Sequence, residues 1–386
     1  MKYKITLVFL LFFNLFFAQT AIKQDSVFAK KIKIFNTNYK EFEVVGNEVY
    51  AITKGDSLIV FNLNSTRKKI LSKSAVSLVK NVNSEILFID KKGNVFKQIK
   101  KNKFQVIDSL KANLFYKILV DNHNEIIVFS DKAIHYKNSE YIPNVDSPFY
   151  RKAGRRKRSD FLMPADFLFL DKNNYLWFAY DAGEWGGDVC FFDLKNRKFI
   201  YDTYDNNGPE FPYNFFIGSG VKGITSFSET IYVTSSKMHF YLSGDISKIK
   251  KVTGKYQICD DDSFLARTSI DTLRNWYKND TEEKLIERQK DFIEEYLGPI
   301  QFNPFNNSVY YYSNFGFFKL EEFDDCNFSK RLLFRPWIYW TAGLPDAIGY
   351  QMNITKFEFI SENELVFLTT NNGIGYYNGT EVKYFQ

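Results

Sequence analysis

The sequence predicts an all-β protein in which one short antiparallel unit is repeated along the chain. Aromatic residues make up 18% of the chain, and most of them lie in short runs that alternate apolar and polar positions. Such alternation is typical of strands, because successive side chains of a strand point to opposite faces. The runs are separated by turns rich in Asn, Gly, Asp and Ser, and the same succession of strands and turns recurs.

The repeated unit consists of a hydrophobic strand, a turn, a second strand, another turn and a third strand. Its seven copies span residues 42–63, 77–99, 116–138, 166–194, 221–243, 300–320 and 354–379. Equivalent second-strand positions are Val49, Ile86, Ile126, Leu176, Ile231, Val309 and Leu365. Short antiparallel units at such intervals are the signature of propeller blades. The sequence therefore predicts a seven-bladed β-propeller of four-stranded antiparallel blades. Six or eight blades are the alternatives, because the long interval before the sixth copy could hide a degenerate unit.

The fourth strand of each blade is the least regular part of the repeat, as in residues 68–73 and 197–204. The chain ends in a strand-like run at 380–386, and residues 30–36 precede the first full copy. Closing the ring would remove exposed sheet edges. We therefore predict that one strand from the N-terminal region pairs with the final blade.

A helical insertion over residues 271–299 is predicted between the fifth and sixth blades, with one amphipathic helix at about 280–297. Asp280 is a candidate N-cap, and Glu283 follows three residues later as in a capping box. The apolar stripe of this helix consists of Leu285, Ile286, Phe292, Ile293, Tyr296 and Leu297. The Gly-Pro pair at 298–299 then predicts its end. Such a helix would cover an apolar patch on the propeller rim or dock a partner.

Residues 1–18 have the features of a secretory signal peptide. Lys2 and Lys4 precede an almost unbroken apolar run over residues 5–17. This run is shorter than the ~20 apolar residues of a bilayer-spanning helix, although a transmembrane anchor is the alternative. We expect a cleaved signal, a periplasmic or secreted chain, and no membrane insertion of the mature chain. The mature residues 19–386 are expected to form a single propeller domain.

The three cysteines fit an oxidising compartment in which one disulfide forms and one thiol is left over. Cys190 lies in an apolar strand-like run and is expected to be a buried small hydrophobe. If a disulfide forms, we expect it between Cys259 and Cys326. The sequence has no CxxC motif and no Cys/His cluster. Structural zinc is therefore not expected, and no other metal or cofactor is predicted.

Two of the copies resemble bacterial regulator-type β-propeller repeats, which read Asp-x-x-Gly-x-Leu-Trp and, further on, Thr-x-x-Gly followed by aromatic positions. The fourth copy matches the first half through Leu170, Asp171, Asn174, Leu176, Trp177 and Phe178. The seventh copy matches the second half through Thr370, Gly373, Ile374, Tyr376 and Tyr377. The resemblance implies the propeller fold. Members of that family often form periplasmic sensor regions of membrane kinases, but no kinase follows here and that role is not carried over.

The segment 181–188, with the sequence DAGEWGGD, is the first candidate binding site. It joins the second and third strands of the fourth copy, where other copies have short turns such as 54–57 and 370–373. Its glycines permit conformations that other residues resist, and Trp185 offers a flat surface for a sugar or an apolar group. The carboxylates that could bind a cation or a polyol are Asp181, Glu184 and Asp188. The alternative is that Trp185 covers the blade and the carboxylates are solvated.

A second candidate is the aromatic-rich connection at 334–353, which contains Trp337 and Trp340. The segment 204–216, which leads into the fifth copy, is similar in character. Packing between blades is the alternative for both. If these long segments emerge on one face of the propeller, they would together form a recognition surface, because loops on a rigid scaffold commonly carry function.

The segment 151–160 is strongly basic and lies between the third and fourth copies. Its central residues are Arg155, Arg156, Lys157 and Arg158. We interpret it either as a solvated loop or as a patch for an anionic partner, such as lipopolysaccharide, an acidic polysaccharide or an acidic protein. The whole chain has a formal net charge of +6 with acids and bases interspersed. With the export signal, this makes nucleic acid an unexpected partner.

Enzyme signatures are sparse in the sequence. His123, His135 and His239 do not lie in nucleophile–base or metal-ligand contexts, and no GxSxG, phosphate-loop or HExxH motif occurs. We therefore expect an exported, non-catalytic propeller that serves as a binding or interaction module for an unknown protein or glycan partner. The alternative is a propeller-type glycoside hydrolase or polysaccharide lyase. A glycosidase needs only two suitably spaced carboxylates, and the acid–base candidates would be Asp181, Glu184 and Asp188.

Overall fold

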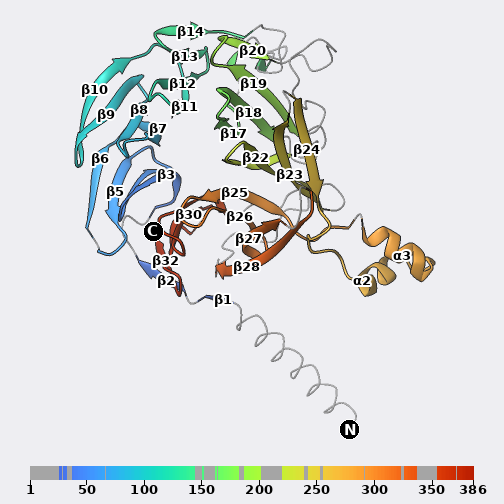
Figure 1. Ribbon diagram of the computed structural model, residues 1–386. Helices are drawn as coiled ribbons and strands as arrows, with labels where there is room; N and C mark the ends of the chain where they lie inside the picture. The colour runs from blue at the N-terminus through green and yellow to red at the C-terminus, as the bar shows by residue number, and fades with distance from the viewer. Residues whose placement is uncertain are drawn as a thin grey trace, which may run out of the picture.

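Seven four-stranded antiparallel sheets are arranged as blades around a ring (Figure 1). This computed structural model confirms the predicted seven-bladed β-propeller. It describes residues 26–386 except 28, 33–36, 66, 144–149, 152–160, 163, 182–186, 201–219, 239–241, 253–254, 291, 323–325, 337–353 and 371. The predicted signal peptide at 1–18 lies outside the described residues.

The first four blades follow one another along the chain. Blade 1 contains β3 (Tyr39–Val45), β4 (Glu48–Thr53), β5 (Leu58–Asn62) and β6 (Lys68–Ser72). Blade 2 contains β7 (Ala75–Lys80), β8 (Ile86–Asp90), β9 (Asn94–Lys100) and β10 (Lys103–Ser109). Blade 3 contains β11 (Phe115–Val120), β12 (Ile126–Ser130), β13 (Ile134–Tyr136) and β14 (Ser139–Tyr141). Blade 4 contains β17 (Phe167–Leu170), β18 (Tyr175–Asp181), β19 (Gly187–Asp193) and β20 (Lys198–Ile200).

The last three blades complete the ring. Blade 5 contains β21 (Gly220–Phe227), β22 (Thr230–Met238), β23 (Leu242–Val252) and β24 (Lys255–Asp261). Blade 6 contains β25 (Leu297–Asn303), β26 (Ser308–Ser313), β27 (Gly316–Glu322) and β28 (Phe328–Pro336). Blade 7 contains β29 (Ile354–Phe359), β30 (Leu365–Thr369), β31 (Ile374–Tyr377) and β32 (Val382–Phe385). In each blade the strands pair in chain order, and the first strand lies nearest the centre of the ring.

Two short N-terminal strands lie along the outer edges of the last two blades. β2 (Ala29–Ile32) pairs in parallel with β32 of blade 7, which confirms the predicted pairing of an N-terminal strand with the final blade. β1 (Ser26–Val27) pairs in parallel with β28 of blade 6. Both are fifth strands added to blades that already have four. The N-terminal segment therefore covers the outer edges of two neighbouring blades and does not supply a missing strand.

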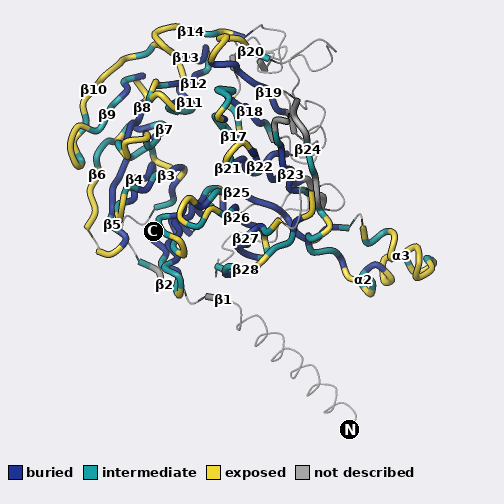
Figure 2. Tube along the Cα trace, viewed as in Figure 1, coloured by how far each residue is buried: buried dark blue, intermediate teal, exposed yellow. Residues whose placement is uncertain are grey.

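The core consists of seven apolar clusters, one between each pair of neighbouring blades. Successive residues of a middle strand contribute to different clusters. Val49 packs against blade 7, for example, whereas Tyr50 packs against blade 2. Both faces of each blade are therefore buried, which explains why the second strands read as continuous apolar runs. Figure 2 shows the buried middle strands and the more exposed outer strands.

In blades 2, 3, 4 and 6, a buried Asp or Asn side chain closes the turn between the first and second strands. In blade 4, Asp171 Oδ1 accepts hydrogen bonds from the backbone of Asn173 (2.8 Å) and Tyr175 (2.9 Å). Its Oδ2 accepts a bond from Trp177 Nε1 at 3.0 Å. Asn174 has a φ of 65°, at the position where the resembled repeat has glycine. The Asp-x-x-Asn-x-Leu-Trp match in this copy therefore describes a turn and the core residue that follows it.

The connection between blades 5 and 6 holds two helices, and the predicted helix at about 280–297 is wrong over its C-terminal half. α3 spans Glu282–Gln289, and the shorter α2 (Ile270–Trp276), which the sequence interpretation missed, precedes it. The N-cap of α3 is Thr281, whose side chain accepts a bond from Lys284, and not Asp280. β25 already begins at Leu297, so the Gly-Pro pair belongs to a strand.

Tertiary contacts explain this early helix end. Glu295 is fully buried, and its carboxylate accepts bonds from the Ser313 hydroxyl (2.8 Å) and the Ala266 backbone (3.0 Å). It also forms an ion pair with Lys330. Ile293 pairs with Arg267 in an isolated β-bridge. Ile293 and Leu297 of the expected stripe therefore lie in extended structure, where their tertiary contacts outweigh their helical spacing, whereas Leu285 and Ile286 lie in α3.

Cys259 and Cys326 form a disulfide, as expected, with an S–S distance of 2.06 Å. Cys259 lies on β24, the outer strand of blade 5, and Cys326 lies between β27 and β28 of blade 6. The bridge therefore joins two neighbouring blades. Cys190 is a buried free cysteine packed between blades 3 and 4, which confirms its expected role as a small core residue.

Candidate functional site

The two faces of the ring carry different kinds of connection. Because each blade is an antiparallel meander, its second-to-third turn and its connections to neighbouring blades lie at the same end. Hydrogen bonds join these segments directly: Ala75 N donates to Asp56 O at 2.8 Å, and Lys91 N donates to Ser74 O at 2.9 Å. We call this end the insertion face. The opposite end, where the first-to-second and third-to-fourth turns lie, is the turn face.

All the long connections between described strands begin and end on the insertion face. They join β14 to β17, β20 to β21, β24 to β25, and β28 to β29, at residues 142–166, 201–219, 262–296 and 337–353. On the turn face, no connection between described strands is longer than five residues. The strand ends that flank these segments therefore lie on one face, which is the condition for a shared recognition surface.

The first candidate segment continues the hairpin of blade 4. β18 and β19 stay paired up to Tyr180↔Asp188 and Asp181↔Gly187. Asp181 and Asp188 therefore belong to the strands, and only 182–186 connects them. Glu184 and Trp185 lie outside the described residues. The segment does join the second and third strands of blade 4, at the insertion face, as the sequence indicates.

Blade 5 has a still longer hairpin, which the sequence interpretation missed. Its third strand is β23, whereas the fifth copy was expected to end at residue 243. Ile231 pairs with Ile249, while the equivalent Val49 pairs with Phe61. The apolar pattern expected of a blade strand is interrupted in β23 by several lysines. One of them, Lys248, is only 3% exposed and forms an ion pair with Glu322, so it occupies a core position.

Arg155, Arg156, Lys157, Arg158, Trp337 and Trp340 lie outside the described residues. The basic segment does begin and end on a small hairpin of β15 (Tyr150–Arg151) and β16 (Phe161–Leu162). There, Arg151 pairs with Phe161. Both ends of the segment 152–160 are therefore close together.

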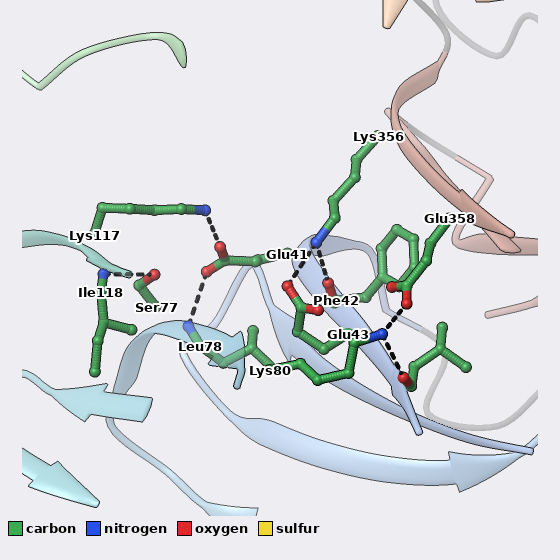
Figure 3. A network of polar contacts seen from close by, with 11 residues as sticks. Glu41, Phe42, Glu43, Ser77, Leu78, Lys80, Lys117, Ile118, Lys356 and Glu358 are labelled. Carbon is green, nitrogen blue, oxygen red and sulfur yellow. Dashed lines mark hydrogen bonds and ion pairs between the residues drawn. The ribbon is translucent and has the colours of Figure 1, made fainter. Parts of the chain in front are cut away.

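A network of charged side chains lies on the innermost strands of blades 7, 1, 2 and 3 (Figure 3). Its members are Glu41, Glu43, Lys80, Lys117, Lys356 and Glu358. Glu41 forms an ion pair with Lys117 of blade 3, and its other oxygen accepts a bond from Leu78 N of blade 2 at 3.0 Å. In the same way, Ser77 Oγ accepts a bond from Ile118 N at 3.2 Å. These side chains satisfy the open backbone edges of neighbouring inner strands.

The lysines of this network bind both carboxylates and backbone carbonyls. Lys356 Nζ lies 2.7 Å from both Glu43 Oε1 and Phe42 O. Lys80 pairs with Glu358 and donates to the Val44 carbonyl at 2.9 Å. The three glutamates are thus each paired with a lysine. Such pairing favours a structural role over that of an acid–base pair.

Burial and neighbouring charges shift the protonation of two of these groups. Burial, reinforced by Glu43, raises the pKa of the Glu358 carboxyl despite the opposing fields of Lys80 and Lys356. Burial disfavours the charge on Lys356, but the fields of Glu43, Glu358 and Glu41 outweigh it and raise the pKa of the ammonium group. Lys356 therefore stays charged at neutral pH and holds two blades together.

Ser130, His135 and Glu140 are arranged in the order of a Ser–His–acid triad. Ser130 Oγ lies 3.0 Å from His135 Nε2, and His135 Nδ1 lies 3.7 Å from Glu140 Oε1. Ser130 is, however, fully buried. Its oxygen closes the second-to-third turn by accepting bonds from Lys132 N (3.2 Å) and Ala133 N (3.1 Å).

The equivalent Thr369 closes its turn in blade 7, where its Oγ1 accepts a bond from Asn372 N at 2.8 Å. Ser130 therefore caps a turn, with no access for a substrate and with the nearby N–H groups aimed at its own oxygen. Burial also lowers the pKa of His135, so its ring is neutral at pH 7. Within the described part of the chain, no group of three or more His, Cys, Asp or Glu residues could hold a metal ion.

Comparisons with known proteins found similar solved structures, all at low sequence identity. Neither a protein-family model nor a curated protein sequence matches the chain. Among similar solved structures, YCF48 bound to D1 peptide shares 7% identity, with a TM-score of 0.48 over 91% of this chain and 92% of that chain. A GH74 enzyme of Niastella koreensis shares 10% identity, with a TM-score of 0.45 over 87% of this chain and 50% of the enzyme. The WD40 propeller of Doa1 shares 9% identity, with a TM-score of 0.46 over 89% and 94% of the two chains.

No family model supports the finer resemblance to regulator-type repeats. In the described residues, neither helix is long and apolar enough to span a bilayer.

Proposed function

We propose that the protein is an exported, non-catalytic propeller that binds a protein or glycan partner on its insertion face. The observation that carries this proposal is that every long connection between described strands begins and ends on that face. A rigid ring that concentrates its variable segments on one side is the usual construction of a recognition scaffold. The paired carboxylates of the inner strands and the buried Ser130 add support, because neither offers a reactive group to a substrate.

The residues of the insertion-face segments set the chemistry of the proposed partner. Trp185, Trp337 and Trp340 would supply flat apolar surfaces for sugar rings or aromatic side chains. The basic residues 155–158 would favour a partner with carboxylate or phosphate groups. Asp181, Glu184 and Asp188 would hydrogen-bond to hydroxyl or amide groups of the same partner.

Export from the cytoplasm is part of this proposal. Residues 1–18 have the composition of a cleaved signal. The disulfide between Cys259 and Cys326 suits a periplasmic or extracellular location, because disulfides persist in oxidising compartments. Mass spectrometry of the protein purified from its native host tests this directly. Cleavage near residue 18 and an oxidised pair are expected, and an intact leader in the cytoplasmic fraction would contradict export.

Binding can be tested with two defined glycans and matched variants. Calorimetric titration would use oligogalacturonate as an acidic probe and cellohexaose as a neutral one. The variants are Trp185→Ala, a combined Gln replacement of residues 155–158, and the turn-face control Lys172→Ala. We expect binding of at least one probe, weakened at least fivefold by an insertion-face variant and unchanged by the control. Binding that survives both insertion-face variants would contradict the proposed face.

A protein partner would be detected with a photo-crosslinking residue at position 185 and, as control, at position 172. Crosslinks to one defined protein only from position 185 would support the proposal. The absence of both glycan binding and site-specific crosslinks would contradict it. The same glycans test the enzyme alternative: product formation that Glu184→Gln abolishes would replace binding with glycan cleavage as the function.

A further inference from the structure

A groove of about 560 Å³ lies on the turn face between blades 1 and 2. One wall comes from the β3–β4 turn and from β4 and β5, and the other from the β7–β8 turn, β9 and the β9–β10 turn. Polar residues that line it are Asn47, Glu48, Tyr50, Asn62, Gln98 and Lys100. Its volume falls within the range of about 300–1,000 Å³ that is usual for small-molecule sites. It lies on the face opposite the long connections.

At the floor of this groove, the single hydroxyl proton of Tyr50 faces two hydrogen-bond acceptors. The Tyr50 hydroxyl accepts a bond from Gln98 Nε2 at 3.1 Å. It faces two acceptors, Asn102 Oδ1 at 3.1 Å and Glu48 Oε2 at 3.4 Å. A hydroxyl has one proton to donate, so one of these acceptors is left without it. Burial raises the pKa of Tyr50, so this hydroxyl stays protonated at neutral pH.

The walls carry further groups that can bind a ligand. Asn62 Oδ1 accepts a bond from Asn64 N at 3.0 Å, which leaves the Asn62 amide N–H groups available. Glu48 Oε1 pairs with Lys101 Nζ at 2.9 Å, but the Lys101 side chain is 72% exposed. Such an exposed pair is weak and can rearrange. Ile99, 56% exposed, adds an apolar surface beside these polar groups.

The described side chains at the junction between blades 5 and 6 are paired differently from those around this groove. Tyr232 occupies the position of Tyr50 and likewise reaches the third strand of the next blade, where it donates to Glu322. There, Lys248 pairs with the same glutamate and lies 6.0 Å from the Phe328 ring. The side chains of that junction satisfy one another. Between blades 1 and 2, acceptors and amide donors remain on an open groove.

We propose that this groove binds a saccharide or a related polyol. A sugar hydroxyl can donate to the Glu48 carboxylate when the Tyr50 proton is given to Asn102, and it can accept from the amide of Asn62. The C–H face of a sugar ring would lie against Ile99. Because the charges of the groove are largely paired, a neutral ligand is favoured over a simple anion. The groove would bind the same class of ligand as the proposed function, but it lies on the other face. The groove proposal is therefore tested independently of the insertion-face proposal.

The test uses the full mature chain with cellobiose and maltose as neutral probes and inorganic phosphate as the anionic probe. Saturation-transfer NMR and titration should show weak binding of at least one disaccharide. Glu48→Gln and Asn62→Ala should each weaken it at least about fivefold, the effect of losing a hydrogen bond of about 1 kcal/mol. Tyr232→Phe and Lys172→Ala should leave it unchanged.

Glu48→Gln and Asn62→Ala change half-buried positions at the ends of strands, so both proteins should fold, and thermal melting verifies this. Absence of transfer from both disaccharides would overturn the proposal. So would disaccharide binding that survives both groove variants, or phosphate binding tighter than that of either sugar. A loss on Trp185→Ala with no loss on Glu48→Gln would assign the sugar to the insertion face and remove it from the groove.

Discussion

The insertion face and the turn face are formed by the two ends of the same strands, but they differ in the length of their connections and in how those connections are held. On the turn face, short connections are closed by their own side chains, as Asp171 closes the first turn of blade 4. On the insertion face, the long connections between blades 3 and 7 add chain that the ring does not need for closure. This difference indicates that the ring is specified by contacts within each short repeat. The long connections of the insertion face are not needed for the ring, so they can be used for binding.

The largest effect should come from a site where an insertion is joined to the ring. Glu295→Ala removes a buried carboxylate that binds Ser313, Ala266 and Lys330. Breaking a buried ion pair on one side typically costs about 3–5 kcal/mol. We expect a loss of this size in the free energy of unfolding, measured by urea denaturation. A loss below about 1 kcal/mol would show that the insertion is attached independently of this carboxylate.

A turn-face cap should have the next largest effect. Asp171→Ala removes the acceptor for two turn amides and for the buried Trp177 indole. We expect about 2–3 kcal/mol of destabilisation from the lost cap and the buried donor. Asp171→Asn keeps an acceptor for the amides and should cost less. Equal losses for the two variants would contradict the account of the turn.

The stability of the protein should depend on pH through His135, which contacts the buried Ser130 turn of blade 3. Because burial lowers the pKa of His135, the folded state resists protonation while the unfolded state takes up a proton near pH 6.5. The resulting stability is present above that pH and decreases as the pH falls through the folded pKa. His135→Gln should flatten the unfolding free energy between pH 7 and pH 5. An unchanged slope would mean that the ring takes up its proton equally readily in the folded and the unfolded protein.

The smallest effect on stability is expected for the exposed position Lys172 on the turn face. Lys172→Ala should change the unfolding free energy by less than about 0.5 kcal/mol, as is usual for surface positions without partners. Thermal melting would check this. A larger change would disqualify the variant as the matched control for binding.

Most of the ring could be predicted from the sequence because its determinants are local. Apolar second strands follow from blades that are buried on both faces, as Val49 and Tyr50 illustrate. The Asp171 turn was visible for the same reason, whereas the pairing of β2 followed from the need to cover the exposed sheet edges of the ring. The errors lie where tertiary contacts override the local pattern. The helix stops at Gln289 because the residues after it form extended structure around Glu295, and β23 was hidden because Lys248 is neutralised by a distant glutamate.

The candidate site could be predicted less well than the fold. The sequence located the hairpin of blade 4 and the long connections, and strand topology then brought their ends to one face. It did not reveal the groove between blades 1 and 2. That groove depends on a contact of Tyr50 with residues 98 and 102 of the next blade, and no local pattern encodes such a contact. The roles proposed for Trp185, Trp337, Trp340 and residues 155–158 remain predictions.

One paired measurement tests the central claim that recognition lies on the insertion face while the scaffold is independent of it. Residues 182–186 would be replaced by an Asn-Gly turn, which suits a tight hairpin between β18 and β19. Melting temperature and binding to the acidic oligogalacturonate probe, or crosslinking to the partner, would be measured on the same preparation. The account predicts a melting temperature within ~2 °C of the parent and a loss of binding. Unaltered binding, or a cooperative loss of the fold, would contradict it.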